Sequence, residues 1–431
     1  MAVALLVGTG AAATALAQMG GAWSAPVALS APPPPCVPAK CATFPQLAVN
    51  ARGNAVASWR RYVGFGQSRP SGFDCQLSLR RPGGSWSAPE AVPGGACPSL
   101  ALGPDGSVLA VWTASQGGRT VVLAQTRTPE GEWRSRQRLS RSDEDASIPQ
   151  VEVADHAGAV AVWSSRRAGG DYVIEGAAQG RGRGFGSPQV ASGGVSSTTS
   201  LRLAVDDRGD AIAGWSTSSR GQTSALVAFR PAGGRWQAPQ LLARSREFVS
   251  TPAVALDSRG AAIAVWSEHR QGTGALLRTA FAPAGGTFGR PRLLAGRGAA
   301  PEVAFDARGN AVAVWEDDQA AVAALRPAGG SWQPAQVISA PGMRVGTIVV
   351  AVSPGGDAIA VWVRLAFTDS GRLDVVQASV RPAGGRFGAA RDISQPGVLG
   401  GSPQVGMDAR GNAVAIWEGA GAVVEAATYA K

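Results

Sequence analysis

Charged side chains are scarce in this sequence, and one basic residue is almost absent. Asp, Glu, Lys and Arg make up 16% of the 431 residues, and lysine occurs only as Lys40 and Lys431. A coiled coil or an acidic disordered chain would carry far more charge. The formal net charge of +10 therefore comes from arginines, which are spread along the whole chain. A nucleic-acid groove needs clustered cations with exposed aromatic side chains, so we expect no nucleic-acid partner.

Long apolar runs are also missing, apart from one at the start. Residues Ala2 to Ala17 are small and apolar, and Ala15-Leu16-Ala17 has the form of a signal-peptidase site. No other run approaches the roughly 20 apolar residues of a membrane-spanning helix. We expect residues 1–19 to be a signal peptide or its remnant. Residues 20–431 are then expected to form one secreted, monomeric domain without a transmembrane segment.

Cysteine is rare and confined to the first quarter of the chain. An even number of cysteines in an exported protein favours disulfides, and four cysteines allow three pairings. We favour Cys36 with Cys41 and Cys75 with Cys97, because these partners are nearest in sequence. A metal site with four cysteine ligands is the alternative, but no CxxC motif supports it, and we expect no metal.

Signatures of common catalytic sites are absent as well. The sequence has no GxSxG nucleophile elbow, no P-loop, no dinucleotide glycine fingerprint and no His-based metal motif. His269, next to Glu268, is the one candidate for a general base, and a solvated surface side chain explains it equally well. We therefore assign no catalytic residue and no cofactor.

What the sequence does contain is a repeat of about fifty residues, set by a recurring tryptophan. Its spacing lies between 47 and 55 residues, and it occurs at Trp59, Trp112, Trp163, Trp215, Trp266, Trp315, Trp362 and Trp417. A second aromatic residue follows a glycine-rich turn in each unit, at Trp23, Trp86, Trp133, Phe185, Trp236, Phe288, Trp332 and Phe387. All thirteen tryptophans occupy one of these two positions. Packing between repeats explains them better than stacking on a ligand.

A second recurring feature is a tight turn near the start of each unit. In Asp306-Ala307-Arg308-Gly309, the spacing of Asp and Gly predicts a type I turn closed by a left-handed glycine. The Asp side chain is expected to accept backbone N–H bonds, so these repeated carboxylates are structural. The following segment, Ala311 to Trp315, is apolar on both faces, which indicates a strand covered from both sides.

Each unit reads as four strands, and eight units predict an all-β, eight-bladed β-propeller. The segment Gly20 to Pro26 has the pattern of a fourth strand without its first three, whereas the last unit, from Val405 to Tyr429, lacks a fourth. We expect the N-terminal strand to complete the C-terminal blade. The closed ring would then have no open sheet edge.

The alternation of an Asp-x-x-Gly hairpin, a strand ending in Trp and a GG-x-W hairpin resembles the secreted bacterial β-propeller repeat proteins grouped loosely with the sialidase-like superfamily. The resemblance covers residues 20 to 431 and implies the propeller fold. It does not supply catalytic residues. The sialidase Asp box places its Asp five residues before the Trp, whereas Asp306 precedes Trp315 by nine.

In propellers of this strand order, ligands usually occupy the face that carries the loops between blades and between the second and third strands. The longest such loop is expected at Arg60 to Asp74. Polar side chains at the start of the first strands would converge at the mouth of the central channel, namely Gln46, Gln150, Arg202, Glu302 and Gln404. We favour a non-catalytic protein that binds a glycan, a cell-envelope polymer or a protein. The alternatives are a glycoside-active, sialidase-like enzyme and a structural envelope-associated protein.

Overall fold

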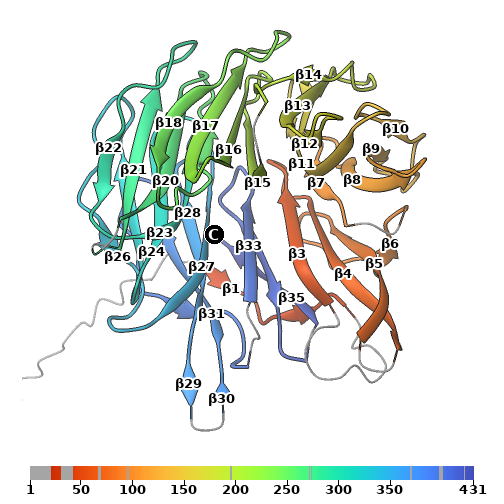
Figure 1. Ribbon diagram of the computed structural model, residues 1–431. Coiled ribbons are helices and arrows are strands. Elements are labelled where there is room, and N and C mark those ends of the chain that lie inside the picture. The colour runs from red at the N-terminus through yellow and green to blue at the C-terminus, as the bar shows by residue number, and fades with distance from the viewer. Residues whose placement is uncertain are drawn as a thin grey trace, which may run out of the picture.

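The structure is a computed structural model, and it describes residues 21–30, 42–66, 69–94, 97–194, 197–270, 272, 274–368, 371–397, 401–421 and 423–431. All regular elements of these residues are β-strands. They form eight antiparallel sheets, each with four strand positions, and one short separate hairpin. The sheets stand around one axis as blades (Figure 1), which confirms the predicted eight-bladed propeller.

The first strand of each blade lies innermost. Each inner strand contacts the next one around the ring, and the last contacts the first. In order from blade 1 to blade 8, they are β3 (Ala42–Val49), β7 (Ser99–Leu102), β11 (Asp145–Ala154), β15 (Thr198–Val205), β19 (Ala253–Leu256), β23 (Ala299–Phe305), β27 (Val345–Val352) and β33 (Gly401–Met407).

The second and third strands form the middle of each blade. They are β4 (Ala55–Gly66) and β5 (Arg69–Arg80), β8 (Val108–Gln116) and β9 (Arg119–Arg127), β12 (Gly158–Arg166) and β13 (Tyr172–Gln179), β16 (Ala211–Ser219) and β17 (Gln222–Arg230), β20 (Ala262–Arg270) and β21 (Gly274–Ala282), β24 (Ala311–Asp317) and β25 (Ala320–Arg326), β28 (Ala358–Arg364) and β31 (Val375–Arg381), and β34 (Ala413–Glu418) and β35 (Val424–Ala430).

The fourth strands are short and lie outermost. In blades 1 to 7 they are β6 (Glu90–Ala91), β10 (Gln137–Arg138), β14 (Gln189–Val190), β18 (Gln240–Ser245), β22 (Arg292–Ala295), β26 (Gln336–Val337) and β32 (Arg391–Asp392).

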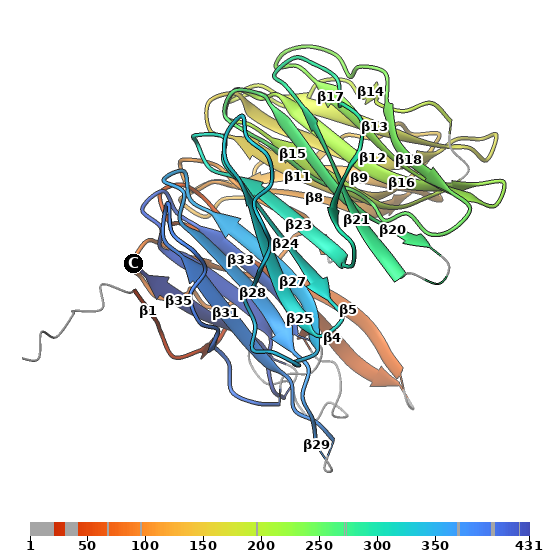
Figure 2. The same ribbon diagram turned by 90° about the vertical axis from the view of Figure 1, so that its left-hand side faces the viewer.

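The N-terminal segment closes the ring, as the sequence predicts. In blade 8 the fourth position is filled by β1 (Ala22–Trp23) and β2 (Val27–Ala28), which both pair with β35. Trp23 lies opposite Tyr429, and their ring centroids are 5.6 Å apart. The C-terminus and β1 accordingly lie next to each other (Figure 2).

The eight repeated tryptophans form the core between blades. Each is at most 1% exposed. They lie in apolar clusters that combine residues of two neighbouring blades, such as Trp315 with Ile263 and Val265 of blade 5. The predicted burial of the second strand on both faces is confirmed, because Ala311 to Trp315 are all buried.

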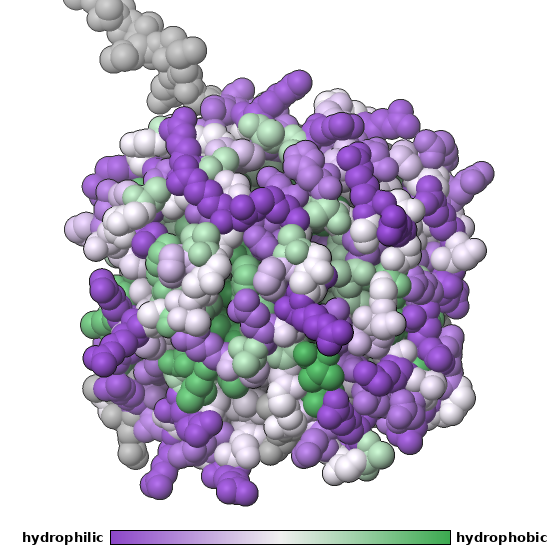
Figure 3. All heavy atoms as spheres, turned by 90° about the horizontal axis from the view of Figure 1, so that it is seen from above, coloured by the Kyte–Doolittle hydropathy of each residue, from purple (hydrophilic) through white to green (hydrophobic). Residues whose placement is uncertain are grey.

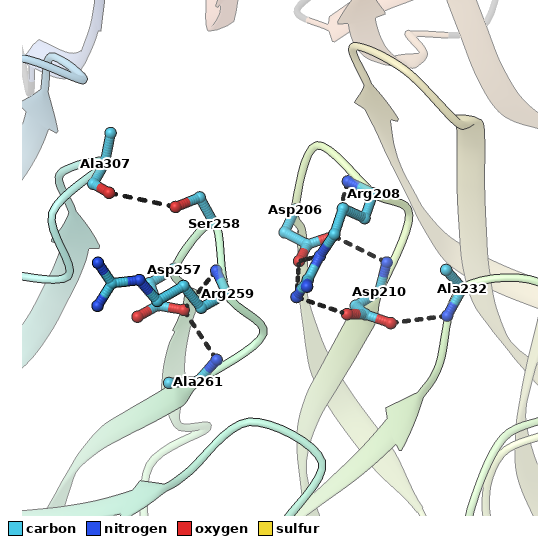
Figure 4. A network of polar contacts seen from close by, with 9 residues as sticks. All are labelled: Asp206, Arg208, Asp210, Ala232, Asp257, Ser258, Arg259, Ala261 and Ala307. Atoms are coloured by element: carbon cyan, nitrogen blue, oxygen red, sulfur yellow. Dashed lines mark hydrogen bonds and ion pairs between the residues drawn. The ribbon is translucent and has the colours of Figure 1, made fainter.

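The predicted turn is also confirmed. In blade 4, one carboxylate oxygen of Asp206 accepts the backbone N–H groups of Arg208 and Asp210 at 3.0 and 2.9 Å. Gly209 has a φ of +88°, which only glycine adopts without strain. Figure 4 shows this turn beside the equivalent turn of blade 5, where Asp257 makes the same bonds.

One segment differs from the expectation. Arg60 to Asp74 was expected to be a loop, but pairing of β4 with β5 continues through it to Gly66 and Arg69. The prediction of a loop was wrong because antiparallel pairing, once started, extends whenever both backbones remain extended. This long hairpin and the hairpin of β29 (Phe367–Thr368) and β30 (Gly371–Arg372) project towards the same side of the ring (Figure 2).

A disulfide joins Cys75 of β5 to Cys97 before β7, with Cα atoms 5.1 Å apart. The predicted pairing of these two cysteines is confirmed, and it connects blade 1 to blade 2. The predicted pairing of Cys36 with Cys41 lies outside the described residues.

Hydrophilic residues separate small groups of apolar residues on the surface seen from above (Figure 3). The described part of the chain holds no helix with the length and apolar character needed to cross a membrane.

Candidate functional site

The five predicted site residues lie at one position of the inner strands, and we call them the mouth ring: Gln46, Gln150, Arg202, Glu302 and Gln404. Four of them come directly after a register shift in the pairing of their strand with the second strand, and Arg202 comes one residue later, after Leu201. Such bulges bend a strand and re-aim its side chains. The bulge therefore decides the direction of these side chains.

Four of these bulges contain a residue in the left-handed region directly before a proline. These residues are Phe44, Ile148, Ala300 and Ser402, with φ of 55°, 45°, 45° and 30°. Side chains other than glycine rarely adopt such values, and the cost is of order 1–3 kcal/mol for each residue. Strain of this kind persists where the surrounding fold fixes it and is often found beside functional sites.

Two members of the mouth ring meet directly. A guanidinium nitrogen of Arg202 lies 3.0 Å from a carboxylate oxygen of Glu302. Arg202 belongs to blade 4 and Glu302 to blade 6, and the equivalent residue of blade 5 is the small Ala253. The two side chains thus reach each other in front of blade 5, on the side of the inner strands that faces the axis.

Two opposing effects act on the pKa of the Glu302 carboxylate. Burial among the inner strands raises its pKa, and the positive charge of Arg202 lowers it, with burial the larger effect. The pair is partly open to solvent, because the side chains of Arg202 and Glu302 are 51% and 31% exposed. Both charged groups therefore remain accessible to a ligand.

The three glutamines of the ring are mostly free to bind. Gln150 donates from Nε2 to the carbonyl of Pro149 at 3.0 Å. Gln46 is exposed and Gln404 is half-buried. Among the described residues, the side chains of Gln46 and Gln404 have no hydrogen-bond partner. Their amides could donate to and accept from a polar ligand.

Sequence reasoning missed one ionisable residue of this region, Glu152. It follows Gln150 by two residues on β11, so both side chains point to the same face of the blade. The surrounding protein raises the pKa of Glu152 to about 7 because it disfavours the charged form. The equivalent residues of the other blades are all Ala or Gly: Ala48, Ala101, Ala204, Ala255, Ala304, Ala351 and Gly406. An alignment of the repeats would have singled out Glu152.

An aromatic stack lies beside the mouth ring on blade 1. The guanidinium of Arg60 is 4.9 Å from the ring centroid of Phe44 and 4.4 Å from that of Phe73. Phe44 and Phe73 are 57% and 47% exposed. The N–H of Phe44 donates to Glu418 of blade 8 at 2.7 Å, which anchors the stack across the closure of the ring.

The candidate general base His269 does not combine with its neighbour Glu268. Adjacent residues of a strand point to opposite faces, and each has its own contacts. His269 is exposed and packs edge-on against Phe248, with centroids 5.3 Å apart. Glu268 accepts from Nε1 of Trp266 at 3.0 Å and lies 3.5 Å from Arg278.

Within the described ranges, no three His, Cys, Asp or Glu side chains gather closely enough to hold a metal ion.

No protein-family model matches the sequence, and no curated protein sequence is significantly similar to it. Several solved propellers are similar in structure. The lectin BP39L from Burkholderia pseudomallei has 12% sequence identity and a TM-score of 0.51, and the match covers 77% of this chain and 96% of that chain.

The β-propeller domain of the Trilobed protease from Pyrococcus furiosus has 10% identity and a TM-score of 0.46 over 78% of this chain and 95% of that chain. A Hadza microbial sialidase has 11% identity and a TM-score of 0.40 over 82% and 73%. At such low identity these similarities concern the fold alone. The chain is an eight-bladed β-propeller whose structural neighbours include lectin and sialidase propellers.

Proposed function

We propose that this protein is a secreted, non-catalytic binding protein that recognises a carbohydrate through the mouth ring. The observation that carries the proposal is the contact of Arg202 with Glu302 across the front of blade 5. It supports a convergence of side chains from separate blades at the axis. Amides and partly exposed charges suit sugar hydroxyl groups, which both donate and accept hydrogen bonds.

The aromatic stack beside the ring also supports this proposal. Phe44 and Phe73 expose apolar faces next to polar groups, a combination that suits a sugar ring with its apolar face and polar edge. The long β4–β5 hairpin, which carries Phe73, stands at the rim of the same site.

A glycan array with the labelled protein tests the proposal, followed by calorimetric titration of the glycans that bind. We expect Gln46→Ala combined with Gln404→Ala to weaken binding about tenfold or more, because two hydrogen bonds of about 1 kcal/mol each are lost. The control is Gln333→Ala, an exposed glutamine in the turn of blade 6. Absence of glycan binding, or an equal loss in the control, would show that the proposal is wrong.

Export is part of the proposal and is supported by the Cys75–Cys97 disulfide, since such bonds persist in oxidising compartments. The apolar segment Ala2 to Ala17 would direct it. Mass spectrometry of protein recovered from the culture medium of an expressing bacterium should give Gln18 as the first residue. Full-length protein found only inside the cells would contradict export.

One observation favours a second candidate, a glycoside-active enzyme. The surrounding strands disfavour the charged forms of Glu152 and Glu302 and so raise the pKa of both, that of Glu152 to about 7 although this residue is exposed. Carboxylic acids with raised pKa values serve as general acids in glycoside hydrolysis. Release of reducing ends from bound glycans, reduced on the order of 100-fold by Glu152→Gln, would establish this function in place of the first.

A further inference from the structure

Neighbouring blades are linked at their outer edges by a repeated glutamine. The side-chain amide of this glutamine forms hydrogen bonds with the backbone of the residue at the second aromatic position of the next blade. Gln137 donates to the carbonyl of Phe185 at 2.7 Å and accepts its N–H at 2.8 Å. Gln240 makes the same two bonds to Phe288, and Gln336 makes them to Phe387. This clasp closes the interfaces of blades 2–3, 4–5 and 6–7.

Between blades 1 and 2 the position of the glutamine is filled by Glu90. Its carboxylate pairs with Arg127 at the end of the third strand of blade 2, at 2.6 Å from Nε and 3.1 Å from Nη2. Two bonds from one guanidinium to both oxygens of one carboxylate make a strong and directional contact. At the interface of blades 1 and 2, the protein's own carboxylate on Glu90 therefore accepts hydrogen bonds from two N–H donors of the Arg127 guanidinium.

Between blades 5 and 6 the arginine is present and the carboxylate is not. Arg326 occupies the position in blade 6 that Arg127 occupies in blade 2, because each lies opposite the first residue of the second strand of its blade. Arg292 follows Phe288 by four residues, as Glu90 follows Trp86, and the two residues pair with equivalent positions of the third strand. The position that supplies the acid in blade 1 therefore supplies a second cation in blade 5.

Arg326 is buried without a counter-charge. It is 9% exposed, and its guanidinium lies over the ring of Phe281 in blade 5 at 4.2 Å. Among the described residues, none accepts a hydrogen bond from its side chain. Burial lowers its pKa, with no carboxylate acting against that effect. Its guanidinium nitrogens are not among the fully enclosed polar atoms, so an acceptor in the adjoining groove can reach these unused donors.

A groove of about 820 Å³ lies at this interface. Arg290, Arg292 and Arg326 line it together with Phe281, Leu293 and Trp332, and its described lining contains no Asp or Glu. Trp332 is half-buried and Leu293 is 56% exposed. The groove thus combines three cations with flat apolar surface.

We propose that the groove between blades 5 and 6 binds the carboxylate of an acidic saccharide. The ligand carboxylate takes the place that Glu90 occupies between blades 1 and 2, with Arg326 as the forked donor. Arg290 and Arg292 add attraction at the rim, and the apolar side chains contact the sugar ring. This site is separate from the mouth ring, and it does not depend on the function proposed for that ring.

Calorimetric titration with tetragalacturonate and with a mannuronate tetramer tests the proposal. We expect saturable binding that weakens with salt, and no binding of the neutral methyl ester. Arg326→Gln should weaken binding about tenfold or more, as loss of a charged hydrogen bond does. Arg259→Gln, which removes an exposed arginine outside the groove, is the charge-matched control and should bind normally.

A second variant separates occupation of the groove from damage to the fold. Arg292→Glu places a carboxylate where Glu90 stands in blade 1, so that it can pair with Arg326. We expect the melting temperature to be unchanged or higher and the binding of tetragalacturonate to be lost. Gln46→Ala with Gln404→Ala should retain this binding, so failure of the mouth-ring proposal would be recognised separately.

Three results would overturn the proposal. They are no saturable binding of either uronate tetramer, unchanged affinity in both groove variants, and equal binding of inorganic polyphosphate with the same losses. The last result would assign the groove to phosphate groups.

Discussion

Equivalent tryptophans lie in unequal surroundings. The indole N–H of Trp266 donates to Glu268 at 3.0 Å, and that of Trp417 donates to Glu425 at 2.8 Å. Trp163 and Trp362 also have side-chain acceptors. In contrast, the buried N–H groups of four others have no acceptor among the described residues: Trp59, Trp112, Trp215 and Trp315. The acceptors belong to positions that the repeat does not fix.

This difference predicts unequal costs for the same substitution. Trp266→Phe removes similar volume to Trp315→Phe, but it leaves the carboxylate of Glu268 without its indole donor. We expect Trp266→Phe to lower the free energy of unfolding by about 1 kcal/mol more, because a partly buried acceptor loses a bond. Chemical denaturation of both variants measures this. Equal costs would show that the bond contributes nothing.

The raised pKa of Glu152 predicts that the free energy of unfolding depends on pH. Its pKa rises from 4.5 in the unfolded chain to about 7 in the fold, so folding favours the protonated form. Relative to Glu152→Gln, the wild type should lose stability as the pH rises from about 4.5 through 7, and the two should be alike near pH 4. Thermal unfolding from pH 4 to 8 tests this, with Glu130→Gln in an exposed turn as the control. A difference that is independent of pH would contradict it.

The positions of the mouth-ring residues could be predicted from the sequence because each follows from the repeat. The contact of Arg202 with Glu302 could not be predicted. It depends on how the bulges turn the side chains and on the curvature of the ring, which places blades 4 and 6 within reach of each other. The raised pKa of Glu152 depends in the same way on the enclosing strands.

At the scale of strands, the links between blades are of several chemical kinds. Three interfaces have the glutamine clasp, and one has the pair of Glu90 with Arg127. The turns add backbone contacts, such as the N–H of Ala307 to the carbonyl of Pro354 at 3.2 Å. Specific hydrogen bonds and one ion pair therefore join neighbouring blades, in addition to apolar packing.

The disulfide between blades 1 and 2 predicts a loss of stability on its removal. Cys75 and Cys97 are separated by 22 residues, and closing a loop of this length stabilises a fold by about 3 kcal/mol. We expect Cys75→Ala with Cys97→Ala to lower the free energy of unfolding by about that amount in chemical denaturation. The variant should also become insensitive to reductant at this interface. Unchanged stability would show that the other blade contacts suffice.

The strands themselves were largely predictable, because the Asp-x-x-Gly turns and the glycine-rich turns before the second aromatic residue mark their ends. The lengths of the strands were harder to predict from the sequence. The hairpin of β4 and β5 extends through Arg60 to Asp74, although this segment carries no repeat pattern. Its extension depends on pairing between two backbones, and side-chain periodicity does not record that pairing.

For the whole molecule, the closing blade is the decisive element. Besides the pairing of β1 and β2 with β35, the N–H of Leu29 donates to Val424 at 2.7 Å and that of Val424 to the Ser30 hydroxyl at 2.9 Å. Leu29 also packs with Trp59 and Ile416. The segment thus covers the outer strand of blade 8 and part of the interface with blade 1.

A chain that begins at residue 31 should therefore expose the edge of β35 and associate through it, because unpaired edges join other strands. We expect larger particles in light scattering and a lower melting temperature than for a chain that begins at residue 20, which keeps the closing strands. A monodisperse truncated chain of equal stability would contradict this role.

The register of the closing blade also determines how the ring responds to tension. Ala22 lies opposite Ala430 and Ala28 opposite Glu425, so the start of β1 and the end of β35 meet at one end of the ladder. When these two ends are pulled apart, the backbone hydrogen bonds that join β1 and β2 to β35 bear the force one after another. Sliding the strands past each other would load all of them together. We therefore expect tension on these two ends to peel β1 and β2 from β35 before any other strand pairing breaks.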